Sequence, residues 1–203
     1  MNALLKPLVH QSKLLNEPIV PTPELIKEFN ISAKTSIARS KPSAPLKQLL
    51  ADGLITGSVL NYGKGRANKD SEAIIDATGR CIDYDFCYAP FPELLGTEYD
   101  TIYCGYVVNT LPPGGAREHV WQQMANATKG FCYVAARSNT DRGIKGIPHE
   151  DGVRTSISTF QRGYCKNELM SEALSYFKHV VELKTKGAYR MVQCSHSPFD
   201  EAQ

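Results

Sequence analysis

Two glycines follow a short apolar run in the segment Val59-Leu60-Asn61-Tyr62-Gly63-Lys64-Gly65. A strand that ends in G-x-G and leads into a helix brings its backbone close to a ligand, because glycine lacks a β-carbon. The free N–H groups at the helix start attract polar or anionic groups. Asp85 follows 20 residues after Gly65, where a carboxylate can accept hydrogen bonds from ribose hydroxyls. This spacing favours a site for a nucleoside-containing cofactor over a purely structural turn.

Two other nucleotide-binding loops fit this segment poorly. A dinucleotide-binding loop would have a third glycine near position 68, where the chain has Asn68. A Walker-type loop would place Ser or Thr after the lysine, whereas Lys64 is followed by Gly65. The cofactor is therefore expected to contain a nucleoside without following either of these two patterns.

The elements that must position this loop alternate between apolar strands and helices. Such near-continuous apolar strands predict a parallel sheet with helices on both faces. Only five residues, 184–188, join the last two strands, and a parallel crossover needs about a dozen, so this pair is expected to be antiparallel. Strands are predicted over 57–62, 80–85, 99–108, 131–136, 179–183 and 189–194, and helices over 22–29, 43–53, 70–77, 116–127 and 167–177.

From about residue 34 to 194 the chain resembles the class I S-adenosylmethionine-dependent methyltransferases. The family's loop follows an acid in a pattern like D-Y-G-C-G-R-G, which reads N-Y-G-K-G-R-A over 61–67 here. The segment 99–109 looks like the family's fourth motif, whose end flanks the transferred methyl group. The resemblance implies an α/β fold with an open, mostly parallel Rossmann-like methyltransferase sheet, an antiparallel C-terminal strand and an N-terminal helical extension. Residues 1–56 would form the arm and extension, and 57–203 the methyltransferase domain.

The resemblance also implies S-adenosylmethionine as the cofactor, methyl transfer as the activity and no metal. Methyl transfer is an in-line displacement that depends on alignment and on exclusion of water, so no catalytic triad is expected. The cofactor would be held by Asn61, Tyr62, Gly63, Lys64, Gly65, Asp85, Phe86, Cys104 and Gly105. The residues expected beside the transferred methyl are Tyr106 and Asn109, and those expected to meet the substrate are Lys34, Arg39, Phe160, Gln161 and Tyr164.

The expected methyl acceptor rests on two shorter sequence similarities. Segments 34–39 and 158–164 are similar to a small bacterial and phage group associated with DNA modification, which implies a nucleobase in DNA. The alternative reading of Asn109 is a turn residue before the prolines that follow it, and that of Phe160 and Tyr164 is ordinary packing. The long connection over 138–164 is interpreted as a lid over the substrate.

Three departures from the family pattern bear on activity. Asn61 replaces an acid and cannot pair with the cofactor's ammonium group. Lys64 places a cation in the loop, pointing outward or toward the cofactor's carboxylate. Too few residues separate Asp85 from Tyr99 for the family's usual helix and strand, so residues 86–88 would contact the adenine instead. The alternatives are a degenerate cofactor-binding module that acts through a partner, a small-molecule methyltransferase, and an enzyme that uses the cofactor differently or binds another nucleotide.

Composition and charge set outer limits on the function. The formal net charge of +2 excludes a strongly basic nucleic-acid coat protein. The charge is uneven, since residues 1–66 carry +5, 67–113 carry −6 and 114–203 carry +3. If the basic segment borders the pocket, an anionic acceptor such as a nucleic acid becomes plausible. No signal peptide, membrane span or C-x-x-C pair is evident, so a cytoplasmic protein with six reduced cysteines is expected.

Overall fold

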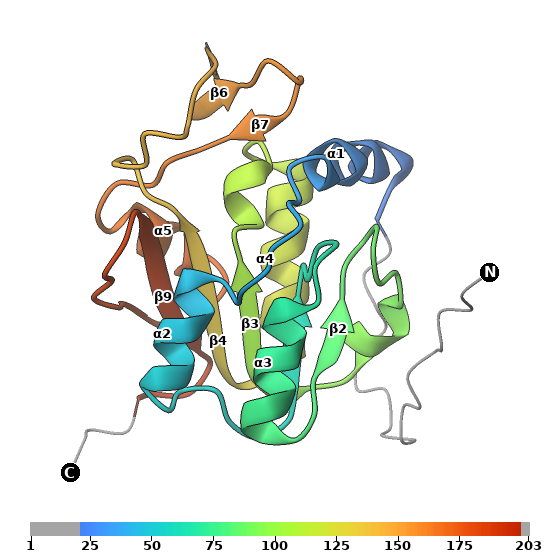
Figure 1. The fold of residues 1–203 in the computed structure, drawn as a ribbon, viewed down its shortest axis with the longest axis vertical. Coiled ribbons are helices and arrows are strands. Elements are labelled where there is room, and N and C mark those ends of the chain that lie inside the picture. The colour runs from blue at the N-terminus through green and yellow to red at the C-terminus, as the bar shows by residue number, and fades with distance from the viewer. Residues whose placement is uncertain (1–20, 200–203) are drawn as a thin grey trace.

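The computed structural model describes residues 21–199, so the predicted irregular arm over 1–20 lies outside the described residues. A six-stranded sheet forms the centre of the molecule, in the order β2-β1-β3-β4-β9-β8 (Figure 1). Its strands are β1 (Val59–Tyr62), β2 (Ile82–Tyr84), β3 (Tyr99–Gly105), β4 (Thr128–Arg137), β8 (His179–Glu182) and β9 (Tyr189–Ser195). The helices are α1 (Pro23–Ala33), α2 (Ala44–Ala51), α3 (Lys69–Thr78), α4 (Gly115–Ala127) and α5 (Glu168–Ala173).

The strand directions confirm the predicted α/β fold. Strands β2, β1, β3 and β4 run parallel, while β9 is antiparallel to both β4 and β8. The short 184–188 connection between β8 and β9 leaves no room for a crossover, which explains the antiparallel pair. The sheet is therefore open and mostly parallel, with antiparallel strands β9 and β8 at one edge.

Helices cover both faces of the sheet, as the apolar strands predict. Helices α2 and α3 lie in front of the sheet in Figure 1, where Leu46 and Ile74 pack with Tyr103 of β3. Helix α4 lies behind, and its Trp121 packs with Ile102 of the same strand. Successive residues of a strand point to opposite faces, so β3 supplies side chains to both halves of the core.

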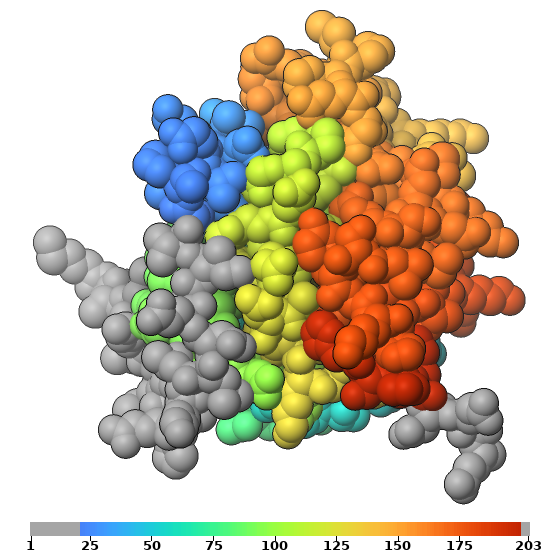
Figure 2. Space-filling view, turned by 180° about the vertical axis from the view of Figure 1, so that it is seen from behind, coloured from blue at the N-terminus to red at the C-terminus, as the bar shows by residue number. Residues whose placement is uncertain are grey.

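The N-terminal extension is tied to the sheet domain through α1. Thr22 caps this helix by accepting a hydrogen bond from the Leu25 N–H at 3.4 Å, and the helix continues to Ala33, four residues beyond the predicted end. Glu28 accepts a hydrogen bond from the Ala116 N–H at the start of α4 (3.2 Å), and the Ser32 and Thr110 hydroxyls lie 2.6 Å apart. Figure 2 shows α1, in blue, lying against this part of the chain.

The segment between β2 and β3 is as short in structure as the sequence indicates. It holds only the 3₁₀ helix η1 (Pro92–Gly96) and a bridge between Asp85 and Ala89. The sheet therefore ends at β2, and the turn after Asp85 lies directly beside the loop after β1.

The connection over 138–164, interpreted from the sequence as a lid, contains strands of its own. The segment forms a separate antiparallel sheet of β5 (Ile147–His149), β6 (Gly152–Arg154) and β7 (Phe160–Gln161), which projects above the carboxyl ends of the main strands (Figure 1). A bridge between Ser138 and Tyr164 closes its base. This small sheet is called the β5–β7 arm below.

Within residues 21–199, no helix combines the length and hydropathy that a membrane crossing would require.

Candidate active site

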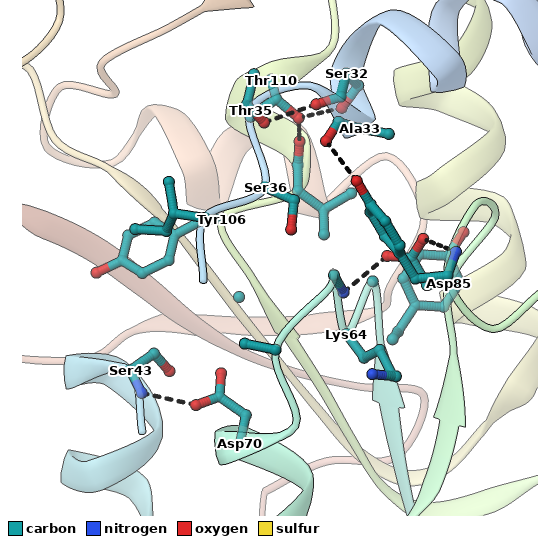
Figure 3. Close-up of a pocket in the computed structure, with 18 of the residues that line it drawn as sticks. Ser32, Ala33, Thr35, Ser36, Ser43, Lys64, Asp70, Asp85, Tyr106 and Thr110 are labelled. Atoms are coloured by element: carbon teal, nitrogen blue, oxygen red, sulfur yellow. Dashed lines mark hydrogen bonds between the residues drawn. The ribbon is translucent and has the colours of Figure 1, made fainter. Parts of the chain in front are cut away.

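A cavity of about 570 Å³ opens at the carboxyl ends of β1, β2 and β3 (Figure 3). Ligands of open α/β sheets bind at this edge, and small-molecule sites commonly have volumes of about 300–1,000 Å³. Its walls are the loop after β1, the turn after β2, the segment after β3 and, from the N-terminal extension, residues between Phe29 and Ala44. Part of the helical extension therefore borders the cavity.

The G-x-G loop requires glycine for two separate reasons. Gly63 has φ +71° and Gly65 has φ +66°, a backbone conformation that other residues adopt only with strain. A β-carbon on Gly63 would also lie 2.2 Å from Cγ2 of Val107, and one on Gly65 would lie 2.6 Å from Oγ of Ser36. The missing β-carbons therefore let the segments after β3 and α1 close over the loop.

Gly63→Ala is expected to destabilise the fold more than Gly53→Ala does. Gly53 has φ +68° but no atom within 4 Å of an added β-carbon, so its variant carries the strain of about 1–3 kcal/mol alone. Gly63→Ala adds the clash with Val107, and overpacking commonly costs about 1–3 kcal/mol more. Urea denaturation of both variants measures the difference. Equal losses of unfolding free energy would show that Val107 does not restrict the loop.

Asp85 binds the loop and its own turn through the backbone. One carboxylate oxygen accepts the Gly65 N–H at 2.8 Å, and the other accepts the N–H groups of Cys87 and Tyr88 at 2.9 Å each. A carboxylate offers about four acceptor positions, so three amides leave capacity for a ligand hydroxyl. Figure 3 shows Asp85 directed at the loop. Its carboxylate therefore fixes the loop while remaining an acceptor at the cavity wall.

The turn after Asp85 connects the cavity to α1. The Phe86 ring stacks on Phe29 with centroids 4.6 Å apart, and the Tyr88 hydroxyl donates to the Ala33 carbonyl at 3.2 Å. Burial raises the pKa of the Cys87 thiol, so this side chain stays protonated at neutral pH. The predicted contacts of residues 86–88 with an adenine stay a prediction, although all three side chains line the cavity.

The structure corrects the predicted place of two side chains. Asn61 is buried and donates from Nδ2 to Ser71 (3.2 Å) and Asp83 (3.0 Å), under the loop rather than in the cavity. Cys104 is completely buried, and burial raises its pKa well above the usual value. Alternate residues of a strand face opposite sides of the sheet, so a motif read along one strand includes side chains that do not face the ligand.

An acid that the sequence reading missed faces the cavity instead. Asp70, at the start of α3, accepts the Ser43 N–H at 2.7 Å, and its other oxygen lies 3.7 Å from the Arg39 guanidinium (Figure 3). An acid in the first turn of a helix is common because it interacts favourably with the helix dipole. Nothing in the sequence therefore distinguished this acid from an ordinary helix start.

Tyr106 and Arg39 line the same part of the cavity. The guanidinium carbon of Arg39 lies 5.4 Å from the centre of the Tyr106 ring. Tyr106 has φ +65°, and its N–H donates to the Ala135 carbonyl at 2.7 Å, which holds this strained residue in place. Burial raises the pKa of Tyr106 to about 12, so its hydroxyl is a hydrogen-bond donor rather than a base at neutral pH.

Asn109 and Gln161 meet at the cavity wall, and their amides are occupied by hydrogen bonds within the protein. Asn109 is 1% exposed; its Oδ1 accepts the Arg137 N–H at 3.3 Å, and its Nδ2 donates to the Gln161 oxygen at 3.3 Å. Arg137 also donates to the Gln161 oxygen at 3.2 Å and from Nε to Asp141 at 2.7 Å. This network joins the β5–β7 arm to the segment after β3, so Asn109 is a positioning residue as well as a wall residue.

Lys64 lines the cavity from the loop itself. Its Nζ donates to the Asn68 side chain at 2.6 Å, at the start of α3. This contact directs the ammonium along the loop toward α3.

Three predicted substrate residues do not line the cavity. Lys34 is exposed on the extension. Tyr164 is completely buried, with the Arg162 guanidinium 4.1 Å from its ring centre, and Phe160 is 6% exposed, with Arg117 5.6 Å from its ring centre. The structure therefore places Phe160 and Tyr164 away from the cavity and packs both, in agreement with the alternative reading of ordinary packing.

Residues 21–199 contain no group of three or more His, Cys, Asp and Glu side chains placed to hold a metal ion.

The similarity of this chain to known proteins lies in its structure. No protein-family model matches the chain, and no curated sequence matches it either. Among solved structures, the DhpI–SAH complex is similar at TM-score 0.54 and 15% identity over 77% of this chain and 84% of that one. The Burkholderia thailandensis 1,6-didemethyltoxoflavin-N1-methyltransferase with S-adenosylhomocysteine is similar at TM-score 0.55 and 11% identity over 74% and 76%.

A third similar structure is the methyltransferase domain of bacterial CtHen1, at TM-score 0.53 and 10% identity over 75% of this chain and 97% of that domain. At these identities the likeness shows the fold. The chain therefore has the Rossmann-like fold of the class I S-adenosylmethionine-dependent methyltransferases.

Proposed function

We propose that this protein is an S-adenosylmethionine-dependent methyltransferase. The observation that carries the proposal is the G-x-G loop, whose Gly65 N–H is hydrogen-bonded to the Asp85 carboxylate. Gly63 and Gly65 let Val107 and Ser36 pack closely against the loop, and Asp85 holds the loop while keeping acceptor capacity at the cavity wall. Both features lie in a cavity at the carboxyl edge of the sheet, where this fold places its ligand. The residues present therefore fit a nucleoside cofactor.

Each part of the cofactor has a partner of matching chemistry in the cavity. Asp85 would accept a ribose hydroxyl, and the aromatic side chains Phe86 and Tyr88 would border the adenine. Asp70 supplies the negative charge for the cofactor's ammonium that Asn61 cannot supply. When bound, the cofactor supplies an electrophilic methyl group on a sulfonium.

The remaining wall serves to align an acceptor and exclude water. Tyr106 offers a protonated hydroxyl as a donor, and the amides of Asn109 and Gln161 are held rigidly by their mutual hydrogen bond. Helix α1 and the segment after it cover the loop through Ser36, whose hydroxyl accepts the Arg66 N–H at 3.0 Å. Positioning of this kind provides most of what a displacement at a methyl group needs.

A nucleobase in DNA is one proposed acceptor, supported by the sequence similarity over 34–39 and 158–164. Part of the first segment, including Ser36 and Arg39, does border the cavity, whereas Tyr164 of the second is buried away from it. A nucleic-acid partner and a cytoplasmic location stay predictions.

Calorimetry with S-adenosylmethionine and S-adenosylhomocysteine tests the cofactor proposal. Both ligands are expected to bind more tightly than ATP and NAD, which also contain adenosine, because Asp70 offers a negative charge to the ammonium group that only the sulfur ligands carry. No heat from either sulfur ligand would refute the proposal.

The second candidate function is a cofactor-binding module without methyl transfer, and Lys64 in the loop is the observation that favours it. A methyltransferase is distinguished from a binding module by incubating the protein and labelled S-adenosylmethionine with DNA, RNA, protein and small-molecule extracts and measuring label transfer. Binding without transfer would favour the module. Lys64→Ala, which removes the cation, is expected to leave transfer intact in an enzyme and to create affinity or activity only in a degenerate loop.

A further inference from the structure

Two arginines border the part of the cavity that the proposed cofactor leaves free. Arg39 comes from the N-terminal extension and Arg137 from the end of β4, about 100 residues apart in sequence. Both line the cavity beside Tyr106. Burial raises the pKa of Tyr106, and the positive charges of both arginines act against this rise, as expected for cations near the same hydroxyl.

Both guanidinium groups keep donors in reserve. Arg39 is 31% exposed, and its contact with Asp70 at 3.7 Å is too long for a hydrogen bond. Toward residues 21–199 this guanidinium makes no hydrogen bond at all. Arg137 uses Nε for Asp141 and Nη1 for Gln161, which leaves its Nη2 without a hydrogen-bond partner in the same residues. An arginine has five N–H donors, so this wall holds several that no described group accepts.

The charges that line the cavity point the same way. Among the charged side chains of the lining, Lys69 is paired with Glu72 at 2.6 Å, and the other three cations (Arg39, Lys64 and Arg137) face three acids (Asp70, Asp85 and Asp141). S-adenosylmethionine adds one net positive charge, since its sulfonium accompanies a zwitterionic amino-acid end. A neutral acceptor would leave this excess uncompensated in a partly enclosed space, whereas an anionic acceptor would balance it.

We propose that the methyl acceptor is a small molecule with an anionic group, a carboxylate or a phosphate, held between Arg39 and Arg137 beside Tyr106. The planar fork of a guanidinium matches both groups with paired hydrogen bonds, and the Tyr106 hydroxyl adds a third donor. The limited cavity volume and the cover provided by α1 favour a small anion over a polymer. This inference rests on the proposed function, because it assigns the space beside the cofactor.

The test is titration of inorganic phosphate and of acetate into protein saturated with S-adenosylhomocysteine, followed by calorimetry. At least one anion is expected to bind, and Arg39→Gln and Arg137→Gln are each expected to weaken it by about tenfold or more, because each removes charged hydrogen bonds. Arg142→Gln is the matched control, since Arg142 is exposed and does not line the cavity. This control is expected to leave anion affinity unchanged.

The thermal midpoint and the affinities of the arginine variants show whether a loss of anion binding comes from the arginine itself. Arg39→Gln removes no hydrogen bond of the described protein, so it is expected to fold with an unchanged thermal midpoint and an S-adenosylhomocysteine affinity within about threefold of wild type. Arg39→Lys keeps the charge without the fork and is expected to fall between Gln and wild type. If no anion binds the loaded protein, or if both Gln variants bind like Arg142→Gln, the inference is overturned while the proposed function stands.

A failure of the proposed function itself gives a different result in these titrations. If S-adenosylhomocysteine does not bind, the proposed function fails, and the same anion titration on the free protein then tests the arginine pair by itself. A single-stranded oligonucleotide that displaces phosphate and binds far more tightly than a nucleoside monophosphate would overturn the assignment to a small acceptor.

Discussion

Asp85→Ala is expected to reduce affinity for S-adenosylhomocysteine on the order of hundredfold, measured by calorimetry. A hydrogen bond to a charged group contributes about 1.5–3 kcal/mol, and a tenfold change in affinity corresponds to about 1.4 kcal/mol. Asp85 makes such bonds to three backbone amides that shape the loop and its neighbouring turn. The variant therefore loses both the proposed ribose contact and the hydrogen bonds that order the loop after β1 and the turn after β2.

Two further variants make this result specific. Asp76→Ala removes an exposed acid of α3 with the same change of charge and is expected to bind like wild type. Asp85→Asn keeps one oxygen acceptor and is expected to lose less affinity than Asp85→Ala. Wild-type affinity in Asp85→Ala, with an unchanged fold, would show that neither a ribose contact nor the bonds from Asp85 to the backbone contribute to ligand binding.

Arg117→Leu is expected to lower the free energy of unfolding by about 3–5 kcal/mol, because Arg117 is buried and loses charged hydrogen bonds, each contributing about 1.5–3 kcal/mol, to Asp151 and to the Leu111 carbonyl. Arg117 is 4% exposed and donates to Asp151 at 2.6 and 3.0 Å and to the Leu111 carbonyl at 2.6 and 2.9 Å. It also lies 3.5 Å from Glu172. For a chain of this size, the loss corresponds to a fall in the thermal midpoint of roughly 6–20 °C.

The matched control is an ion pair at the surface. Lys69 and Glu72 lie 2.6 Å apart on α3, but both are largely exposed, so Lys69→Ala is expected to change stability by less than about 1 kcal/mol. Similar losses in the two variants would show that the buried network does not hold the fold together.

This network also explains why the β5–β7 arm is ordered. Asp151, at the turn between β5 and β6, accepts from both Arg117 and Arg162, at 2.6 Å in each case. Burial raises the pKa of Asp151, but its bonds to Arg117 and the charges of both arginines outweigh that effect and lower it. The arm is therefore anchored to α4, and its Gln161 is held at the cavity wall.

Sequence alone determined the features that depend on local pattern. The apolar strands, the helices between them, the antiparallel last pair and the short connection between β2 and β3 follow from periodicity and connection length. The same holds for the loop with Gly63 and Gly65 and for Asp85, since a strand end, a glycine turn and the next strand end must meet at one edge of a parallel sheet.

Only the tertiary structure decided which side chains reach the cavity. Asn61 lies in the predicted motif yet faces α3, and Tyr164 is enclosed by Glu172 of α5 and by Arg162, whose guanidinium packs over its ring. Conversely, Asp70, which the sequence did not indicate, lies at the cavity beside Arg39, which was expected near the substrate, because α3 and the N-terminal extension converge on the loop. A local pattern fixes the backbone of an element, but the direction of a side chain and its neighbours depend on packing between segments that are distant in sequence.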